Sequence, residues 1–342
     1  MAYTDIDKPS DYFNTNLWTG TGSIQSITGV NFQPDWLWVK TRSTTANHRS
    51  QNSVIGAEYG MNPNQTVAEG FLSDCVTSFD SDGFTLGADS QGYVNTSSRT
   101  YVGWSWLASN TTASNTDGSI TSTVSANTTS GFSIVSYTGN GVSGASIGHG
   151  LNSTPKIVIT KNRSNAVDWF YFTTAIDGSW DYLVLNSTAS KGDSGATAPD
   201  SSVFYATSGT GINTNGDNYV AYCFAEKKGF SKFGSYTGNG NADGTFVYTG
   251  FKPAWVMIKD TAARSWIILD NKRNTFNVVN NRLFPDSADA QNTSVDAADF
   301  TSQGFKIRST NSSVGISGNT YIYMAFAENP FVTSTGVPAC AR

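Results

Sequence analysis

Charged side chains are scarce in this sequence, and basic ones are not in excess. Lys, Arg, Asp and Glu make up 14% of the 342 residues, and the net charge is −5. Because nucleic-acid binding proteins usually carry a basic face, this balance argues against a nucleic-acid partner. No apolar run approaches the roughly 18 residues of a membrane-spanning helix. The first seven residues lack the basic and apolar regions of a signal peptide, so we expect assembly in a cytoplasm.

Residues that commonly hold metals are also few. The sequence has three cysteines, Cys75, Cys223 and Cys340, and two histidines, His48 and His149. None of the cysteines forms a Cys-x-x-Cys pair, so neither a zinc site nor a redox motif is indicated. Cys223 falls in an apolar strand, where a buried free thiol is expected. We therefore expect no metal site and no cofactor.

Carboxylates suited to acid–base catalysis are equally sparse. Glutamate occurs at only four positions, Glu58, Glu69, Glu226 and Glu328. Glu226 and Glu328 end matching strands, which indicates a structural role. Paired acids in a Glu-x-Asp-x-Glu pattern and a Gly-x-Ser-x-Gly nucleophile turn are both missing. The chain is therefore not expected to be an enzyme, and we assign no catalytic residues.

Turn-forming and β-forming residues dominate what remains. Gly, Ser, Thr and Asn are abundant, and aromatic residues reach 13%. This composition is too aromatic for a disordered chain and too poor in strong helix formers for a helical one. Aromatic and β-branched residues between turn formers predict an all-β protein.

One pattern recurs three times along the chain. An aromatic-Thr-Gly-x-Gly turn is followed by a proline, and a hydrophobic strand then runs to a lysine six residues after that proline. A Tyr-led apolar strand closes each unit, which indicates a tandem array in which the glycine turn is scaffold. The turns lie at 18–22, 137–141 and 236–240, the proline strands at 34–40, 155–161 and 253–259, and the closing strands start at Tyr101, Tyr219 and Tyr321.

The repeats predict three tandem β-sandwiches of the jelly-roll or lectin type. We expect repeat one with an N-terminal arm at 1–117, repeat two at 118–228, and repeat three with a C-terminal tail at 229–342. The strand Trp36–Lys40 is apolar on both faces, so we expect it between two layers or beneath an adjoining subunit. Repeats two and three meet almost without a linker and should pack rigidly.

Aromatic residues that follow polar loops are the candidate binding residues. Trp169, Trp180, Tyr182 and Trp266 fit this description. Aromatic faces suit sugar rings, and nearby Asn and Asp side chains can hydrogen-bond hydroxyls, so these four residues are a possible glycan site. The core of a sandwich is the alternative location, because Trp169 and Trp266 begin strands that recur.

Repeat one has polar His48-Arg49 at the position of Trp169 and Trp266, so we expect it to have diverged there. If the chain binds anything specifically, we expect the site in the regions that the repeats do not share, at 41–75, 162–200 and 270–298.

Several motifs together carry a resemblance to a known protein family. They are the opening segment 1–9, the Gln-Pro-Asp-Trp strand entry at 33–36, the hairpin sequence at 78–84, the Tyr-Thr-Gly-Asn-Gly copies and the closing strand 219–226. Together they span most of the chain and resemble repeat-containing virion proteins of marine tailed bacteriophages, which are tail-fibre-like and concanavalin-A-like. The resemblance implies a virion protein on a tail or capsid, and it supplies no catalytic residues.

The function implied by this resemblance is that of a tail-fibre or host-attachment component presenting β-sandwich domains to host surface glycans. Two alternatives stay open. One is a capsid decoration protein that clamps capsomers, and the other is a glycan depolymerase with an unrecognised acid pair. The implied location is the virion, assembled in the host cytoplasm. The implied partners are other virion proteins and possibly a host glycan, and a homotrimer is expected only by analogy.

Overall fold

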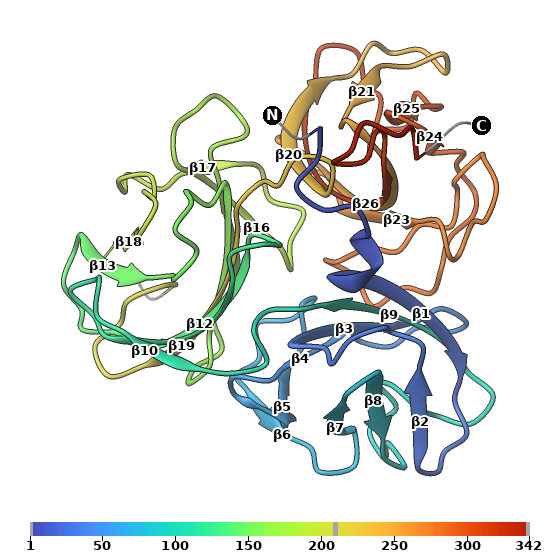
Figure 1. Ribbon diagram of the computed structural model, residues 1–342. Coiled ribbons are helices and arrows are strands. Elements are labelled where there is room, and N and C mark those ends of the chain that lie inside the picture. The colour runs from blue at the N-terminus through green and yellow to red at the C-terminus, as the bar shows by residue number, and fades with distance from the viewer. Residues whose placement is uncertain (1–2, 208–210, 340–342) are drawn as a thin grey trace.

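The computed structural model describes residues 3–207 and 211–339, and almost all of its regular structure is strand. The single helical element in these ranges is one 3-10 turn, η1, Pro9–Asp11. The described strands form six antiparallel sheets that pair into three sandwiches (Figure 1). The expected all-β sandwich architecture is therefore confirmed.

The first sandwich pairs a sheet of order β1-β9-β3-β4-β5-β6 with a smaller sheet of order β2-β8-β7. Its strands are β1 Phe13–Thr19, β2 Gln25–Thr28, β3 Trp36–Thr41, β4 Arg49–Asn52, β5 Gly56–Met61, β6 Gly70–Phe71, β7 Val76–Asp80, β8 Gly83–Leu86 and β9 Thr100–Trp106.

The second sandwich pairs a sheet of order β10-β11-β12-β19-β14-β15-β16-β17 with the two-stranded sheet β13-β18. Its first strand starts at Ala113, so this sandwich takes up residues that the sequence placed in repeat one. Its strands are β10 Ala113–Asn115, β11 Ser122–Asn127, β12 Phe132–Thr138, β13 Ala145–Gly148, β14 Ile157–Asn162, β15 Trp169–Thr173, β16 Asp181–Val184, β17 Gly192–Asp193, β18 Val203–Ala206 and β19 Asn218–Phe224.

The third sandwich pairs a sheet of order β20-β26-β22-β23 with a sheet of order β21-β25-β24. None of the described sheets shares strands between two sandwiches. The strands are β20 Ser231–Thr237, β21 Phe246–Tyr248, β22 Phe251–Asp260, β23 Ile267–Asp270, β24 Ala298–Thr301, β25 Gly304–Ile307 and β26 Thr320–Pro330.

The same frame recurs in all three sandwiches. The closing strand lies between the opening strand and the proline strand in each, as in β1-β9-β3, β12-β19-β14 and β20-β26-β22. An aromatic ring of the opening strand stacks on the first Tyr of the closing strand at an interplanar angle of 14° in every copy. The stacked pairs are Trp18 on Tyr101, Tyr137 on Tyr219 and Tyr236 on Tyr321.

The repeated glycine turn has one backbone conformation. Gly22, Gly141 and Gly240 have φ values of 70°, 71° and 68°. Positive φ is costly for residues with a Cβ atom, so glycine is favoured at this position in each repeat. The turn is thus part of the repeated scaffold, as expected.

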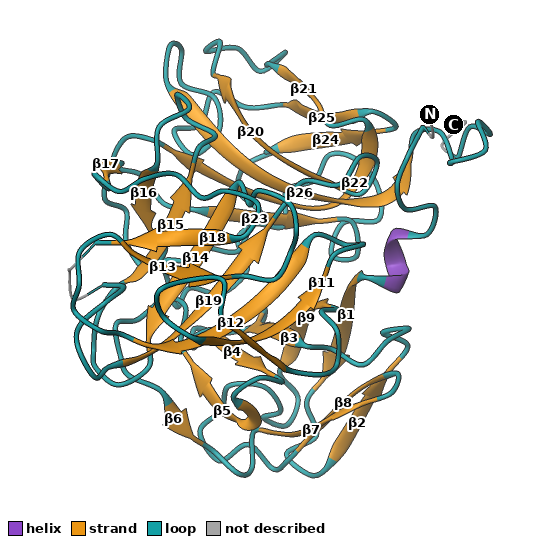
Figure 2. Ribbon diagram, turned by 60° about the vertical axis from the view of Figure 1, so that its left-hand side comes forward, coloured by secondary structure: helices purple, strands orange, loops and turns teal. Residues whose placement is uncertain are grey.

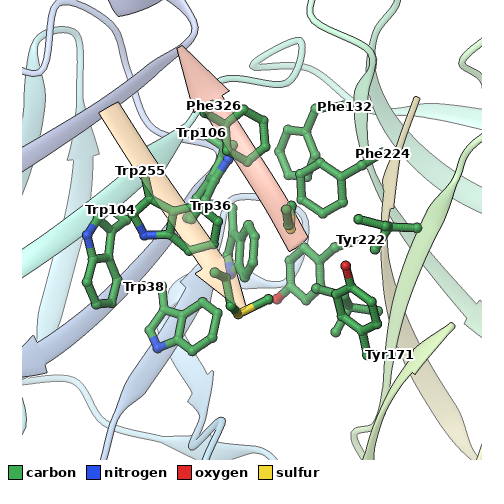
Figure 3. Close-up of a cluster of buried hydrophobic side chains, with 14 of the residues drawn as sticks. Trp36, Trp38, Trp104, Trp106, Phe132, Tyr171, Tyr222, Phe224, Trp255 and Phe326 are labelled. Carbon is green, nitrogen blue, oxygen red and sulfur yellow. The ribbon is translucent and has the colours of Figure 1, made fainter. Parts of the chain in front are cut away.

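Apolar side chains collect in four clusters, one inside each sandwich and one between the sandwiches. The fourth cluster draws residues from all three repeats, among them Trp36, Phe224 and Trp255 (Figure 3). The larger sheets turn their outer faces toward this centre, and the smaller sheets lie on the outside (Figure 1). Strands β3 and β14 are consequently buried on both faces, which explains the run of consecutive apolar residues with which each begins.

The first and last described segments meet on one side of the molecule (Figure 2). The backbone N–H of Ser334 donates to the Asp7 carboxylate at 2.6 Å. Near them, the N–H of Asp5 donates to the carbonyl of Lys228, at the junction of the second and third sandwiches, at 3.0 Å. The N-terminal arm is therefore attached to the far repeats as well as to its own.

Candidate functional site

Trp169 and Trp266, two of the predicted glycan-binding residues, lie in the central core. The Trp169 indole N–H donates to the carbonyl of Asn62 in the first sandwich at 3.0 Å. The Trp266 indole N–H donates to the carbonyl of Val184 in the second sandwich at 3.0 Å. Both rings are buried, so neither offers a face to a sugar. They lie where two neighbouring sandwiches meet, and we call each of these three contacts a seam.

His48 occupies the same seam position in the first sandwich. Its Nδ1 accepts from the Trp38 indole at 2.9 Å, which leaves Nε2 to donate to the carbonyl of Phe284 in the third sandwich at 2.9 Å. Burial and the nearby Lys40 charge hold the pKa of His48 well below its ordinary value, so the ring is neutral. Repeat one therefore has an imidazole in place of the indole, and the hydrogen bond across the seam is kept.

The lysine that ends each proline strand is also buried, and two of the three bond across a seam. Lys40 Nζ donates to the carbonyl of Ala288 in the third sandwich at 3.2 Å, and Lys161 Nζ donates to that of Thr66 in the first at 3.1 Å. Lys259 Nζ donates within its own repeat, to the carbonyl of Ala262 at 2.9 Å. Burial lowers the pKa of each of the three lysines to about 8.

Backbone hydrogen bonds also close the three seams, and their donors follow the opposite cyclic order to the ring donors. The donors lie in the regions that the repeats do not share, so parts of those regions join the sandwiches. The third sandwich bonds to the first, the first to the second and the second to the third: Gln291 N–H to the Arg42 carbonyl at 2.9 Å, Glu69 N–H to that of Arg163 at 3.0 Å, and Lys191 N–H to that of Thr261 at 2.8 Å.

Trp180 and Tyr182, the other two predicted residues, lie at the second sandwich's own core. Trp180 is buried and stacks on Phe172, with ring centroids 5.8 Å apart and an interplanar angle of 15°. Tyr182 is half-buried and lines a pocket of about 310 Å³. Of the four predicted residues, Tyr182 alone lines this pocket. Trp180 contacts it indirectly, by packing against the lining residue Phe172.

The Tyr182 pocket, as we call it, has aromatic walls and a polar rim. Phe170 meets Tyr182 edge-on, with ring centroids 5.5 Å apart. Gly192 lies against the Tyr182 ring so closely that a Cβ atom there would come within 2.5 Å of it. This contact covers one face of Tyr182 and fixes its orientation. The remaining lining residues include Phe172, Asp193, Ser194 and Thr207.

Asp193 provides the charge at the rim. Its side chain is exposed and accepts a hydrogen bond from the N–H of Gly195 at 2.9 Å. A carboxylate has about four acceptor sites, so Asp193 can also accept from ligand hydroxyls. Aromatic walls with a carboxylate and hydroxyls at the rim suit a polyhydroxylated ring.

Phe170 and Phe172 also line the pocket, although neither was predicted from the sequence as a binding residue. The alternation of β15 distinguishes them, because Trp169 and Tyr171 point to the central core and the two phenylalanines to the sandwich interior. A strict two-residue period therefore carried the missing signal.

The other reactive side chains considered from the sequence are buried. Burial raises the pKa of the Cys75 thiol to about 12 and raises that of Cys223. Both thiols are free, as expected for Cys223, while Cys340 lies outside the described residues. Burial lowers the pKa of His149. Within 3–207 and 211–339, no group of three or more His, Cys, Asp and Glu side chains is placed to hold a metal ion.

The part of the chain that the structure describes contains no helix long and apolar enough to span a membrane.

Comparison with known proteins identifies a family. The profile of the family described as "Domain of unknown function (DUF7483)" matches residues 8–330, and the chain therefore belongs to this family. The match runs from just before η1 to the end of β26 and so includes all three sandwiches. No curated protein and no solved structure matches the chain.

Proposed function

We propose that this member of the family is a structural component of a bacteriophage virion, a tail-fibre or host-attachment protein that presents its sandwiches to host surface glycans. The observation that carries the binding part is the Tyr182 pocket, with aromatic walls and the Asp193 carboxylate at its rim. The virion location follows from the sequence resemblance described above.

The pocket's chemistry favours a saccharide over a hydrocarbon ligand. Sugar rings combine an apolar face with outward hydroxyls, so they match an aromatic wall beside hydrogen-bonding groups. A hydrocarbon would gain nothing from the rim carboxylate of Asp193, whereas ligand hydroxyls can donate to it. The pocket volume of about 310 Å³ is at the small end for ligand pockets, which suits one sugar unit of a longer glycan.

The scaffold also suits a component of a particle. The three sandwiches share one apolar core and are joined at every seam by hydrogen bonds. These contacts favour a rigid body in which the loops keep fixed positions. Rigid presentation increases affinity because little conformational entropy is lost on binding.

The test combines binding and imaging. Purified protein should reduce phage adsorption by competing for host glycans, and Asp193→Asn should weaken its glycan binding. Asp117→Asn is the matched control, because Asp117 is an exposed acid of the same sandwich outside the pocket. Labelling of the chain in particle images should locate it on the tail. Failure to bind host glycans, together with unchanged adsorption, would rule out attachment.

Capsid decoration is a second candidate, and the cyclic arrangement of the seams favours it. Three similar sandwiches around one centre present three similar outer faces, which match a position where three capsid subunits meet. Particle images that locate the chain on the capsid lattice would establish this function in place of attachment.

A further inference from the structure

Phe276 is the most exposed large hydrophobic side chain in the described residues, at 84% exposure. It lies in the loop between β23 and β24, inside the region 270–298 that the repeats do not share. Single exposed apolar side chains are common, so exposure alone indicates no site. The rigidity of the loop and the polar groove beside it are what distinguish this position.

Hydrogen bonds hold the loop on both sides of Phe276. Asn274 Oδ1 accepts from the backbone N–H groups of Asn280 and Asn281 at 3.2 and 2.7 Å. Asn277 Oδ1 accepts from the N–H of Phe300 at 2.8 Å, and Asn277 Nδ2 donates to the carbonyl of Phe300 at 2.9 Å. Because its neighbours are fixed, Phe276 is presented in a preorganised position.

A buried ion pair anchors the base of the same loop. Arg273 Nε donates to Asp270 Oδ2 at 2.6 Å, and both side chains are fully buried. The Trp104 indole of the first sandwich donates to the same carboxylate oxygen at 3.1 Å. The loop is therefore fastened to the seam between the first and third sandwiches.

Beside Phe276 lies a pocket of about 360 Å³, which also includes Lys252, Asn271, Lys272 and Glu328 in its lining. A smaller hollow of about 70 Å³ shares Asn271, Lys272 and Glu328 with it and reaches the first sandwich at Thr15. We call the two together the seam groove. It runs from an exposed aromatic ring to the junction of two sandwiches.

Two polar atoms in the seam groove lack partners in the described structure. Asn271 Oδ1 is buried and has no hydrogen-bond partner. The hydroxyl of Thr15, a residue that is only 5% exposed, also lacks one. Buried polar groups in proteins are normally hydrogen-bonded, so both atoms have bonding capacity left for a ligand hydroxyl or a bridging water.

The groove also carries a surplus of positive charge. Lys252 pairs with Glu328 at 2.7 Å, whereas Lys272 is exposed and has no ion pair within the described residues. One ammonium group is thus available to a negatively charged ligand.

We propose that the seam groove binds an acidic saccharide. The sugar ring stacks on Phe276, a carboxylate pairs with Lys272, and hydroxyls bond to Asn271 Oδ1 and Thr15. A protein partner is less well matched, because a protein interface needs a larger apolar patch than one phenylalanine among Asn, Lys and Glu side chains. This inference rests on the proposed glycan-binding function and adds a second site with a defined ligand class.

The test uses the purified full chain, with oligogalacturonate as the acidic probe and a neutral glucan oligomer of equal length, in titration calorimetry. We expect the acidic oligomer to bind more tightly, and Phe276→Ala to weaken it roughly tenfold. Lys272→Gln should remove the preference for the acidic oligomer and the salt dependence of its binding. Ile24→Ala is the matched control, since Ile24 is 81% exposed on the first sandwich and should leave binding unchanged.

The outcomes separate this inference from the proposed function. Wild-type affinity for oligogalacturonate in Phe276→Ala, or binding of a virion protein through Phe276 in place of the oligomer, would overturn the seam groove as an acidic-saccharide site. If the wild-type protein binds neutral host glycans and Asp193→Asn does not, the result would at the same time support the Tyr182 pocket. If neither pocket binds any host glycan, the attachment function and this inference fail together.

Discussion

Trp266 in the third sandwich donates its indole N–H to the backbone carbonyl of Val184 in the second sandwich, over 3.0 Å. Trp169 and His48 make the equivalent bond at the other two seams. The three bonds follow one cyclic order, so the ring of sandwiches is closed within a single chain. Its stability should depend on contacts at every seam.

Replacement of Trp266 by Phe keeps an apolar ring and removes the seam donor. We expect the free energy of unfolding to fall by about 1 kcal/mol, the usual net contribution of one hydrogen bond. The loss stays small because the Val184 carbonyl keeps a second donor, the N–H of Ser187 at 3.3 Å. Trp255→Phe is the matched control, because the Trp255 indole N–H has no hydrogen-bond partner in the described structure and its ring lies in the same core. Denaturant titration measures both, and equal losses would contradict a role for the seam bond.

The shared core predicts that the three sandwiches unfold together. Trp36 stacks on Trp106 of its own sandwich and on Tyr222 of the second, each with ring centroids 4.3 Å apart. Trp36→Ala should therefore lower the free energy of unfolding of the whole chain, by about 3–5 kcal/mol. Calorimetry should show one transition that moves as a unit. Separate transitions, with only one shifted, would show that the sandwiches are independent.

The frame of the fold was readable from the sequence because it rests on local patterns. The proline strand, glycine turn and Tyr-led closing strand each repeat, and each has a defined backbone role. The two apolar faces of Trp36–Lys40 predicted a second layer above the strand, and the structure provides it from neighbouring sandwiches. Whether that layer came from the same chain was not readable, because the contacts join residues more than a hundred positions apart.

The site was only partly readable, since an aromatic residue after a polar loop suits a core as well as a surface. Trp169 and Trp266 look like ligand platforms in sequence, yet each supports a seam. His48 looks like a departure from the pattern, yet its ring nitrogen replaces the indole donor. The exposure of Phe276 could not be predicted from the sequence, because it depends on how the whole loop is folded.

The closed ring of sandwiches also predicts the oligomeric state of the purified protein in solution. The faces that three separate sandwich subunits would use to form a trimer are already buried inside this chain. We therefore expect light scattering to give the mass of one chain, 36.5 kDa, in place of the homotrimer suggested by analogy. A mass about three times larger would show that the outer surfaces associate as well.

The buried lysines make stability depend on pH. Lys161 Nζ donates to three backbone carbonyls, those of Thr66, Asn162 and Asn165, and burial lowers its pKa from 10.5 to about 8. Below pH 8 the lysine is charged in both states, and the folded state carries the full cost of burying that charge. Above pH 8 the unfolded state binds the proton more strongly, so the free energy of unfolding should rise with pH.

This rise is best measured between pH 7.5 and 8.5, which is roughly the interval between the titration of unfolded histidine and that of unfolded cysteine. At higher pH the raised pKa of the Cys75 thiol opposes it, because the unfolded thiol ionises first. Lys161→Met should lower stability by removing three hydrogen bonds. It should also reduce the slope of stability with pH, to which Lys40 and Lys259 still contribute. Lys272→Met, at an exposed lysine, should keep the wild-type slope. Parallel profiles for Lys161→Met and wild type would mean that the buried ammonium does not titrate in this range.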